Sequence, residues 1–292
     1  MRGSNLGPTM HNVRSALITG ASSGIGHALA VALARPAVAL HLSGRDTTRL
    51  EAVAESCRTR GATVHPAVVD VRNADAMAAW IGNAGTLDLV VANAGVSAGT
   101  GEQTRGIFAT NLDGVLNTVL PAMTVMADQP ADAGGVRGRI AAIASIAAFA
   151  PVPHAPAYCA SKAAVDFWMV AGAADARRRG IVLTSVCPGY VRSGMTTHND
   201  FPMPGLMDAD RAARIILRGV AAGRTRVVFP WWIGLAARAS GLLPPRLLAA
   251  WRLPLRRVNL PCRTQRQEKY LPQRSCRRPM RTGAASLLRC PP

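Results

Sequence analysis

The residues with the clearest chemical potential are Tyr158 and Lys162, which lie four positions apart, and Ser145, which lies thirteen positions upstream of the tyrosine. Residues four apart share one face of a helix, so the lysine ammonium can lie beneath the phenol and lower the phenol pKa from about 10 toward a working pH. A phenol tuned in this way can exchange a proton with a carbonyl or alcohol oxygen, and Ser145 can hold the same oxygen. The spacing predicts a proton-transfer site; a solvated Tyr and Lys on a helix surface is the alternative interpretation.

The choice of lysine is informative because the chain contains 32 arginines and only two lysines, Lys162 and Lys269. A compact ammonium can contact a ribose hydroxyl and a phenol together, which a planar guanidinium does less well. Because lysine is so rare in this chain, the spacing of Tyr158 and Lys162 argues against coincidence.

A glycine-rich turn near the N-terminus predicts a phosphate-binding loop. It follows an apolar strand pattern directly and opens a helix, so it offers backbone N–H groups and the positive end of a helix dipole to a pyrophosphate. An ordinary turn between a strand and a helix is the alternative. The residues that we expect to contact a dinucleotide here are Gly20, Ser22, Ser23, Gly24, Ile25 and Gly26.

Strand and helix patterns alternate along the chain, which predicts a doubly wound α/β fold with a parallel sheet, the Rossmann architecture. The predicted strands cover residues 16–19, 38–42, 63–69, 87–92, 139–144, 182–186 and 226–229. The predicted helices cover residues 25–34, 47–60, 74–82, 105–127, 155–179 and 208–222.

The predicted organisation has three parts: a catalytic domain at 13–230, an apolar helical extension with Trp and Arg at 231–253, and a basic tail at 254–292. We expect the tail to be disordered, because it lacks apolar periodicity, although an artefact of the reading frame would look the same. Residues 188–207 interrupt the alternation of strands and helices and predict a binding loop or lid.

These motifs resemble those of the short-chain dehydrogenase/reductase superfamily, in its single-domain form, over about residues 13–230. Besides the turn at 19–26 and the Ser, Tyr and Lys, the matching elements occur in the family's order: Asn93, Ala94, Gly95, Asn111, Pro188 and Gly189. The resemblance implies that Tyr158 is the general acid/base, Lys162 lowers its pKa and holds the nicotinamide ribose, and Ser145 orients the substrate oxygen. It assigns Asn111 to a proton relay, although an asparagine in a helix can equally be a capping or filling residue.

The resemblance also implies further cofactor contacts. Asp70 and Val71 would lie near the adenine, although a turn after a strand also favours aspartate. Asn93, Ala94 and Gly95 would stabilise the sheet and flank the adenosine. The segment after the sixth strand would approach the nicotinamide through Pro188, Gly189, Val191, Ser193 and Thr196, with either hydroxyl a candidate for the carboxamide contact.

The end of the second strand favours NADP(H) over NAD(H). An acid there would bind the adenosine 2′-hydroxyl, whereas a base would bind a 2′-phosphate. The sequence has no acid at the expected place and continues with Arg45, although Asp46 follows at once and Arg45 could be an exposed turn charge.

The predicted reaction is hydride transfer between a nicotinamide and a carbonyl or alcohol substrate. Ala147, His154, Tyr190 and the loop 195–207, which are mainly apolar and small, are expected to form the substrate side. His154 can also be interpreted as a simple loop histidine. A non-catalytic dinucleotide-binding or scaffold protein, a binding module driven by the basic C-terminus, and isomerase or dehydratase chemistry on the same scaffold are the alternatives.

Composition limits the other function classes. The net charge is +18, of which +10 lies in residues 252–292, and aromatic residues make up 4% of the chain, so nucleic-acid binding by stacked aromatics is disfavoured and no specific nucleic acid is expected. Six cysteines without a CxxC pair, and no secretory signal, predict a reduced cytoplasmic setting without a metal site.

No uncharged apolar span of membrane length occurs near the C-terminus, although residues 231–251 could contact a membrane surface, cover the substrate entrance, pack between subunits or dock on their own domain. By analogy with the family, we expect a homodimer or homotetramer through the long helices at 105–127 and 155–179.

Overall fold

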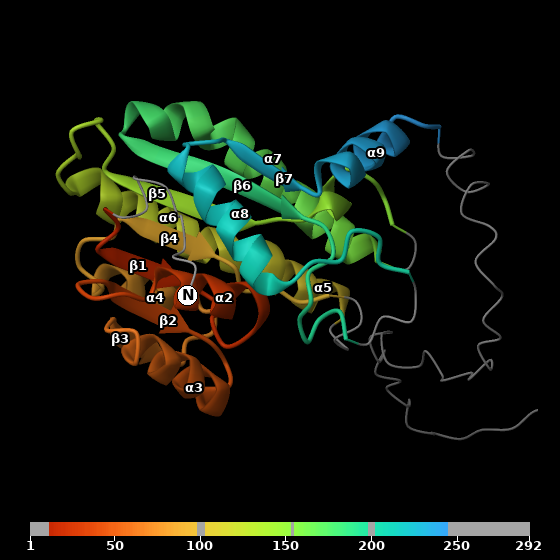
Figure 1. Cartoon of the computed structure of the whole chain (residues 1–292). Coiled ribbons are helices and arrows are strands. Elements are labelled where there is room, and N and C mark those ends of the chain that lie inside the picture. Colours follow the sequence, from red (N-terminus) through yellow and green to blue (C-terminus); the bar gives the residue numbers. More distant parts are fainter. Residues whose placement is uncertain (1–11, 98–102, 153–154, 198–201, 245–292) are drawn as a thin grey trace, which may run out of the picture. The chain divides into compact units, whose positions relative to one another are not determined.

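The computed structural model describes residues 12–97, 103–152, 155–197 and 202–244. Its centre is a seven-stranded sheet in which every neighbouring pair of strands is parallel, in the order β3-β2-β1-β4-β5-β6-β7 (Figure 1). The order reverses between β1 and β4, and the carboxyl ends of strands at such a point form the usual ligand crevice of an open α/β sheet. The strands are β1 (Ser15–Ile18), β2 (Ala39–Ser43), β3 (Thr63–Ala67), β4 (Leu89–Ala92), β5 (Gly138–Ile143), β6 (Ile181–Pro188) and β7 (Arg226–Phe229).

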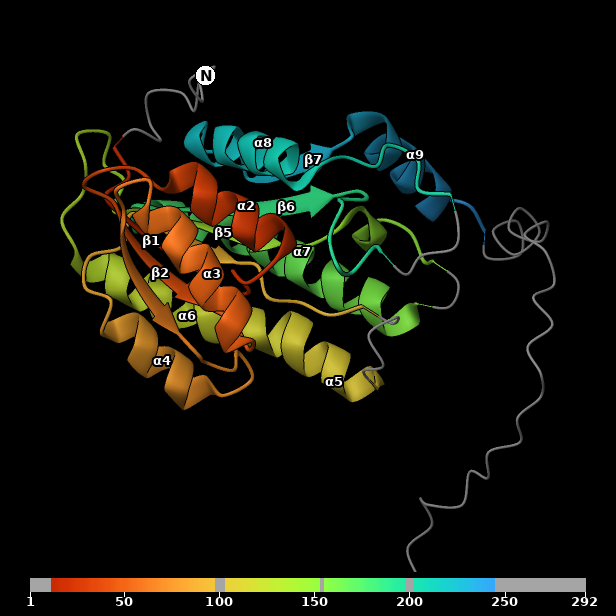
Figure 2. The ribbon, with the colours of Figure 1, turned by 60° about the horizontal axis from the view of Figure 1, so that its bottom comes forward.

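Helices cover both faces of the sheet and complete a three-layer α/β/α fold (Figure 2). One face packs against α2 (Gly24–Leu33), α3 (Thr47–Arg58) and α8 (Ala209–Ala221). The other face packs against α4 (Ala74–Gly82), α6 (Gly114–Asp128) and α7 (Pro156–Arg178). The doubly wound Rossmann fold expected from the alternation of strands and helices is therefore confirmed.

Apolar strands and amphipathic helices explain why the layers form. All residues of β4 and β6 are buried, as expected for parallel strands covered on both faces. Helix α8 shows the complementary pattern, since Ile216 and Leu217 are buried while Arg211, Arg214 and Arg218 are exposed at helical spacing.

The predicted helix at 105–127 is interrupted. It consists of α5 (Thr104–Phe108), a π-helical turn (Ala109–Asp113) and α6. The extra residue in a π turn re-aims side chains, and such turns are frequent at functional sites. Here the turn contains Asn111, which is completely buried.

Strand β3 is shorter than predicted, because it ends at Ala67 rather than at Val69. Its neighbour β2 ends at Ser43, which is the partner of Ala67, so the residues that follow have no strand to pair with. Val68 is correspondingly exposed. Asp70 and Val71 therefore lie in the turn after the strand rather than at its end.

Candidate active site

The glycine-rich turn connects β1 to α2 and leaves no room for side chains at two of its glycines. Gly20 has φ +64°, and a Cβ atom on it would lie 2.8 Å from the Ala94 Cα atom. A Cβ on Gly26 would lie 2.4 Å from the Gly20 carbonyl oxygen and 2.5 Å from the Asn93 side-chain nitrogen. Gly24, with φ +55°, opens α2 opposite the side chain of Ser193. The turn is therefore a tight cradle at a helix N-terminus, a geometry suited to a pyrophosphate.

Asn93 and Thr19 hold this cradle against the end of β4. The Asn93 amide donates to the carbonyl oxygens of Thr19 at 2.9 Å and Gly20 at 3.0 Å. The Thr19 hydroxyl accepts from the backbone N–H groups of Asn93 and Ala94, at 3.0 and 3.2 Å. These bonds fix the turn to the segment Asn93, Ala94 and Gly95 across the point where the strand order reverses.

Asn111 connects the same segment to helix α7. Its side chain accepts from the Val96 N–H at 2.8 Å and donates to the Val96 carbonyl at 2.9 Å and to the Ser161 hydroxyl at 3.1 Å. A Cβ on Gly95 would lie 3.2 Å from the Asn111 oxygen and 3.3 Å from the Lys162 nitrogen. Asn111 and the Lys162 ammonium therefore meet at Gly95.

Ser145, Tyr158 and Lys162 are brought together from two elements. Ser145 follows β5 and caps a 3₁₀ turn (Ile146–Ala148) by accepting from the Ala147 N–H at 3.1 Å, and its side chain is near enough to the Tyr158 phenol on α7 to lower the phenol pKa. Lys162, one helical turn further along α7, donates from Nζ to the Ile143 carbonyl at 2.8 Å, and Nζ lies 5.9 Å from the centroid of the Tyr158 ring. Tyr158 and Lys162 therefore share one face of α7, as predicted, and Ser145 lies next to Tyr158.

Burial changes the acid–base properties of both groups on α7. It lowers the pKa of the Lys162 ammonium from 10.5 to about 8, against a smaller opposing effect of Cys187. Burial raises the pKa of the Tyr158 phenol, and the hydrogen bond from Ser145 only partly offsets that increase. The sequence-based expectation of a lowered Tyr158 pKa therefore differs from the direction in this structure, because desolvation of the phenolate outweighs the other effects.

The segment after β6 returns toward the glycine-rich turn. The Gly189 N–H donates to the Phe229 carbonyl at 2.7 Å, and Val191 is buried in a bridge with Met207. The Thr196 hydroxyl contacts the Val191 and Ser193 backbone within its own loop. The Ser193 side chain instead lies against Gly24. Of the two candidates for the carboxamide contact, Ser193 is thus the one next to the glycine-rich turn. Pro188 is the last residue of β6.

The loop after β2 separates the two neighbouring charges. Arg45 is exposed, whereas the Asp46 carboxylate caps α3 by accepting from the Arg49 N–H at 2.9 Å and the Arg49 Nε at 2.7 Å. The Asp70 carboxylate pairs with Arg72 at 2.6 Å, and this hydrogen bond is the largest cause of a lowered Asp70 pKa, to which Arg45 adds. Asp46 and Asp70 are therefore both engaged by arginines.

The substrate side is only partly described. Ala147 lies in the 3₁₀ turn after Ser145, and Tyr190 is half-buried and contributes to the raised pKa of Tyr158. His154 lies outside the described residues, as do residues 198–201 of the loop 195–207. Leu120 on α6 and Phe167 on α7 are exposed on the helices for which we predicted subunit contacts.

A buried ion pair next to this site was not predicted from the sequence. Asp166, which is completely buried, forms an ion pair with Arg226 at 2.7 Å and accepts from the Ser185 hydroxyl at 2.6 Å. It lies one helical turn beyond Lys162 and also accepts from Cys187 at 3.4 Å. Only the i, i+4, i+8 spacing with Tyr158 and Lys162 could have indicated Asp166, because its partners lie on β6 and β7.

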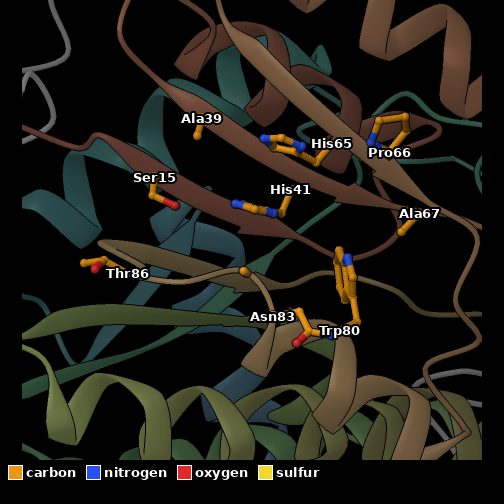
Figure 3. A pocket seen from close by; sticks show the side chains of 10 residues that line it. Ser15, Ala39, His41, His65, Pro66, Ala67, Trp80, Asn83 and Thr86 are labelled. Carbon is orange, nitrogen blue, oxygen red and sulfur yellow. The ribbon is translucent and has the colours of Figure 1, made fainter.

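A groove lies away from these residues, between β2, β3 and helix α4 (Figure 3). It has a volume of about 590 Å³, and His41 and His65 stack on its wall with ring centroids 4.9 Å apart. None of the predicted site residues lines it. Within the described residues there is no group of three or more His, Cys, Asp or Glu side chains that could hold a metal ion, and no helix there is long and apolar enough to cross a membrane.

Comparison with known proteins identifies the family. The profile of the family described as short chain dehydrogenase matches residues 14–201. An uncharacterized oxidoreductase of Myxococcus xanthus is 37% identical over 247 residues, covering 81% of this chain and 95% of the relative. The chain belongs to the short-chain dehydrogenase/reductase superfamily.

Two solved structures have a similar fold. A single-residue variant of the actinorhodin polyketide ketoreductase with NADPH has a TM-score of 0.64 and 24% identity, over 76% of this chain and 98% of that one. A short chain dehydrogenase from Mycobacterium paratuberculosis bound to NAD has a TM-score of 0.64 and 25% identity, over 74% of this chain and 95% of that one. Family membership makes this protein an NAD(P)-dependent oxidoreductase; the family resemblance stated from the motifs is confirmed.

Proposed function

We propose that this protein is an NADP(H)-dependent reductase or dehydrogenase that interconverts a small-molecule carbonyl and alcohol, with Tyr158 as the acid/base. The observation that carries the proposal is the convergence of Ser145, Tyr158 and the buried Lys162 ammonium, whose nitrogen lies 5.9 Å from the centroid of the Tyr158 ring. In the reducing direction the Tyr158 hydroxyl donates its proton to the substrate oxygen, which Ser145 orients by a hydrogen bond. Because burial raises its pKa, Tyr158 keeps its proton at neutral pH and serves as an acid.

The residues present fit a dinucleotide. A Cβ on Gly20 or Gly26 would clash with Ala94, Asn93 or the turn's own backbone, so the turn is compact where it opens α2. We infer that its N–H groups hold the pyrophosphate, together with Ser22, Ser23 and Ile25. The nicotinamide supplies or accepts the hydride when the cofactor is bound. On this proposal Lys162 grips the nicotinamide ribose, and Asn111 holds α7 and the segment at Gly95 in register and contributes to proton relay.

The further contacts of the cofactor follow from the same placement. We assign Asp70 and Val71, with Asn93, Ala94 and Gly95, to the adenosine. We assign Pro188, Gly189 and Val191 to the nicotinamide, with Ser193 rather than Thr196 as the carboxamide contact. The carboxamide assignment is supported by the Thr196 hydroxyl being engaged with its own backbone while Ser193 faces Gly24.

The preference for NADP(H) rests on the charges after β2. An acid that binds the ribose 2′-hydroxyl must have a free carboxylate, and the Asp46 carboxylate is already occupied as the α3 cap. Arg45 is exposed at this strand end, where its positive charge favours a 2′-phosphate over a 2′-hydroxyl. We expect fluorescence titration to give a lower Kd for NADPH than for NADH, and a panel of carbonyl compounds to oxidise bound NADPH, seen as loss of its absorbance.

Replacing Arg45 tests that preference. Arg45→Asp is expected to weaken NADPH binding by about 10- to 100-fold, the equivalent of one charge-assisted hydrogen bond, and to leave NADH binding unchanged or stronger. Arg60→Asp, the same change of charge at an exposed position after α3, is the control and should leave the ratio of the two Kd values as it was. An unaltered ratio in Arg45→Asp would show that Arg45 does not select the cofactor. Binding of neither nucleotide by the folded protein would refute the assignment of the glycine-rich turn.

The lowered pKa of Lys162 predicts a pH dependence of cofactor affinity. An ordinary lysine keeps its charge to about pH 10.5, whereas Lys162 loses it as the pH rises through about 8. If its ammonium grips the ribose, the Kd for NADPH should increase between about pH 7 and about pH 9.5, as measured by fluorescence titration. Lys162→Met should bind more weakly at neutral pH and show little further change. A wild-type Kd that is constant over this range would contradict the assigned role.

A further inference from the structure

Helix α9 (Trp231–Gly241) packs on the domain with its smallest residues. A Cβ on Gly234 would lie 2.3 Å from the Val228 side chain, and a Cβ on Gly241 would lie 2.4 Å from the Phe149 carbonyl oxygen. Gly234 is the buried residue of this helix. A helix docked only on its own domain normally turns its large apolar side chains inward. Of the large apolar side chains on α9 only Ile233 is half-buried, whereas Trp231, Trp232 and Leu235 are exposed.

The outward side of α9 is apolar. Trp231 is 72% exposed, Leu235 is 61% exposed and Leu242, just past the helix end, is 87% exposed. These three positions are spaced to project from one side of the helix, and Trp232 and Leu243 extend the same exposed surface. We call these five residues the α9 apolar face. Large exposed apolar residues gathered on one side of a helix in this way indicate an interaction site.

Helix α9 lies beyond the carboxyl ends of the strands, because it follows β7 directly (Figures 1 and 2). On one side α9 adjoins the loop before α8, where a Cβ on Gly205 would lie 2.9 Å from the Ile233 side chain. On the other it reaches Phe149, and the Arg238 guanidinium lies 4.4 Å from the Phe149 ring centroid. Helix α9, which carries the apolar face, therefore lies at the same end of the sheet as Ser145.

Positive charge is concentrated in the same part of the sequence. Residues 211–292 contain 18 of the 34 Lys and Arg residues but only one of the 16 Asp and Glu residues, Glu268. Helix α9 itself contains no acid, and α8 exposes Arg211, Arg214 and Arg218. The α9 apolar face, with its two tryptophans, therefore lies within a strongly basic part of the sequence. This combination is complementary to a lipid bilayer, which has an apolar interior and, where the lipids are acidic, an anionic surface.

We propose that the α9 apolar face docks the protein onto an anionic lipid bilayer. The helix has 11 residues, about 16 Å at 1.5 Å per residue, so it lies along the interface rather than across the membrane. The tryptophans and leucines enter the boundary between headgroups and acyl chains, and the arginines contact lipid phosphates. Docking brings the strand ends near Ser145 toward the lipid surface. The inference does not depend on the proposed cofactor or reaction.

Vesicle flotation of the full chain tests the proposal. We expect the wild type to float with vesicles of phosphatidylcholine and phosphatidylglycerol, and to bind vesicles of phosphatidylcholine alone much more weakly. Trp231→Glu together with Leu235→Glu should reduce binding to the anionic vesicles by at least about tenfold, because two charges would have to enter the interface. Ala52→Glu together with Ala78→Glu, which adds the same two charges at exposed positions of α3 and α4, should bind as the wild type does. Circular dichroism of each variant establishes that it is folded.

Three results would overturn the proposal. Equal binding of the α9 double variant would mean that basic charge alone attracts the vesicles. Absence of flotation with the anionic vesicles, or equal flotation with the neutral ones, would exclude an anionic bilayer as the partner. A lower mass of the α9 double variant than of the wild type, in sedimentation velocity without lipid, would mean that the face is buried between copies of the chain.

Discussion

Changing Tyr158 to phenylalanine is expected to reduce turnover of any carbonyl substrate by about 10²- to 10⁴-fold, the usual contribution of a positioned general acid. The phenol oxygen is the group that Ser145 contacts in the structure, and the change removes that oxygen and its proton while preserving the ring. The ring also lies over the Lys162 ammonium, so α7 should keep its packing. NADPH affinity, measured by fluorescence, should therefore stay close to that of the wild type while kcat falls.

Tyr190→Phe is the matched control, because it removes the same hydroxyl from a half-buried tyrosine near Tyr158. On the proposed mechanism Tyr190 contributes to the substrate wall and transfers no proton, so most of kcat should remain. Substantial turnover by a folded Tyr158→Phe protein that still binds NADPH would refute the proposed acid. Loss of NADPH binding together with turnover would instead indicate a structural role for the phenol.

The parts of the site that depend on local spacing could be predicted from the sequence. Tyr158 and Lys162 are neighbours on one helix, and Gly20 to Gly26 form a continuous turn, so residue types at fixed offsets identify both. The alternation of strands and helices likewise predicted the confirmed Rossmann fold. Contacts between residues that are close in the sequence can therefore be predicted from a single sequence, because the spacing of the residues determines them.

The contacts made across the fold could not be predicted in this way. Asn111 reaches Val96 and Ser161 because a π turn interrupts the expected helix, and nothing in the residues 109–113 requires that turn. The raised pKa of Tyr158 follows from its burial in the folded protein rather than from its neighbour four residues away. Similarly, the inward Gly234 of α9 is recognisable only once β7 is seen beneath it.

Asp166 shows how such a long-range contact supports the site. It lies four residues beyond Lys162 on α7, and its carboxylate accepts from Ser185 on β6 and from both the Nε and Nη2 atoms of Arg226 on β7. These bonds fix the middle of α7 to two strands, and the same helix carries Tyr158 and Lys162. We infer that Asp166 positions the catalytic helix.

Asp166→Ala is therefore expected to lower the free energy of unfolding by about 3 kcal/mol, at the low end of the range for breaking a buried ion pair, because Arg226 is partly exposed and can regain water. The Ser185 hydroxyl, which is completely buried, would also lose its acceptor. Equilibrium urea unfolding, followed by circular dichroism, measures this change through the transition midpoint.

Asp175→Ala provides the control on the same helix. Its partner is Arg178, and both side chains are more than three-quarters exposed, so this substitution should change stability by no more than about 1 kcal/mol. Equal midpoints for the two variants would mean that the buried pair contributes no more than a surface pair. We also expect the folded Asp166→Ala protein, assayed at low temperature, to have a higher KM for NADPH than the wild type. The reason is that the position of the Lys162 ammonium depends on the placement of α7. A purely global loss of stability would leave the KM of the folded protein unchanged.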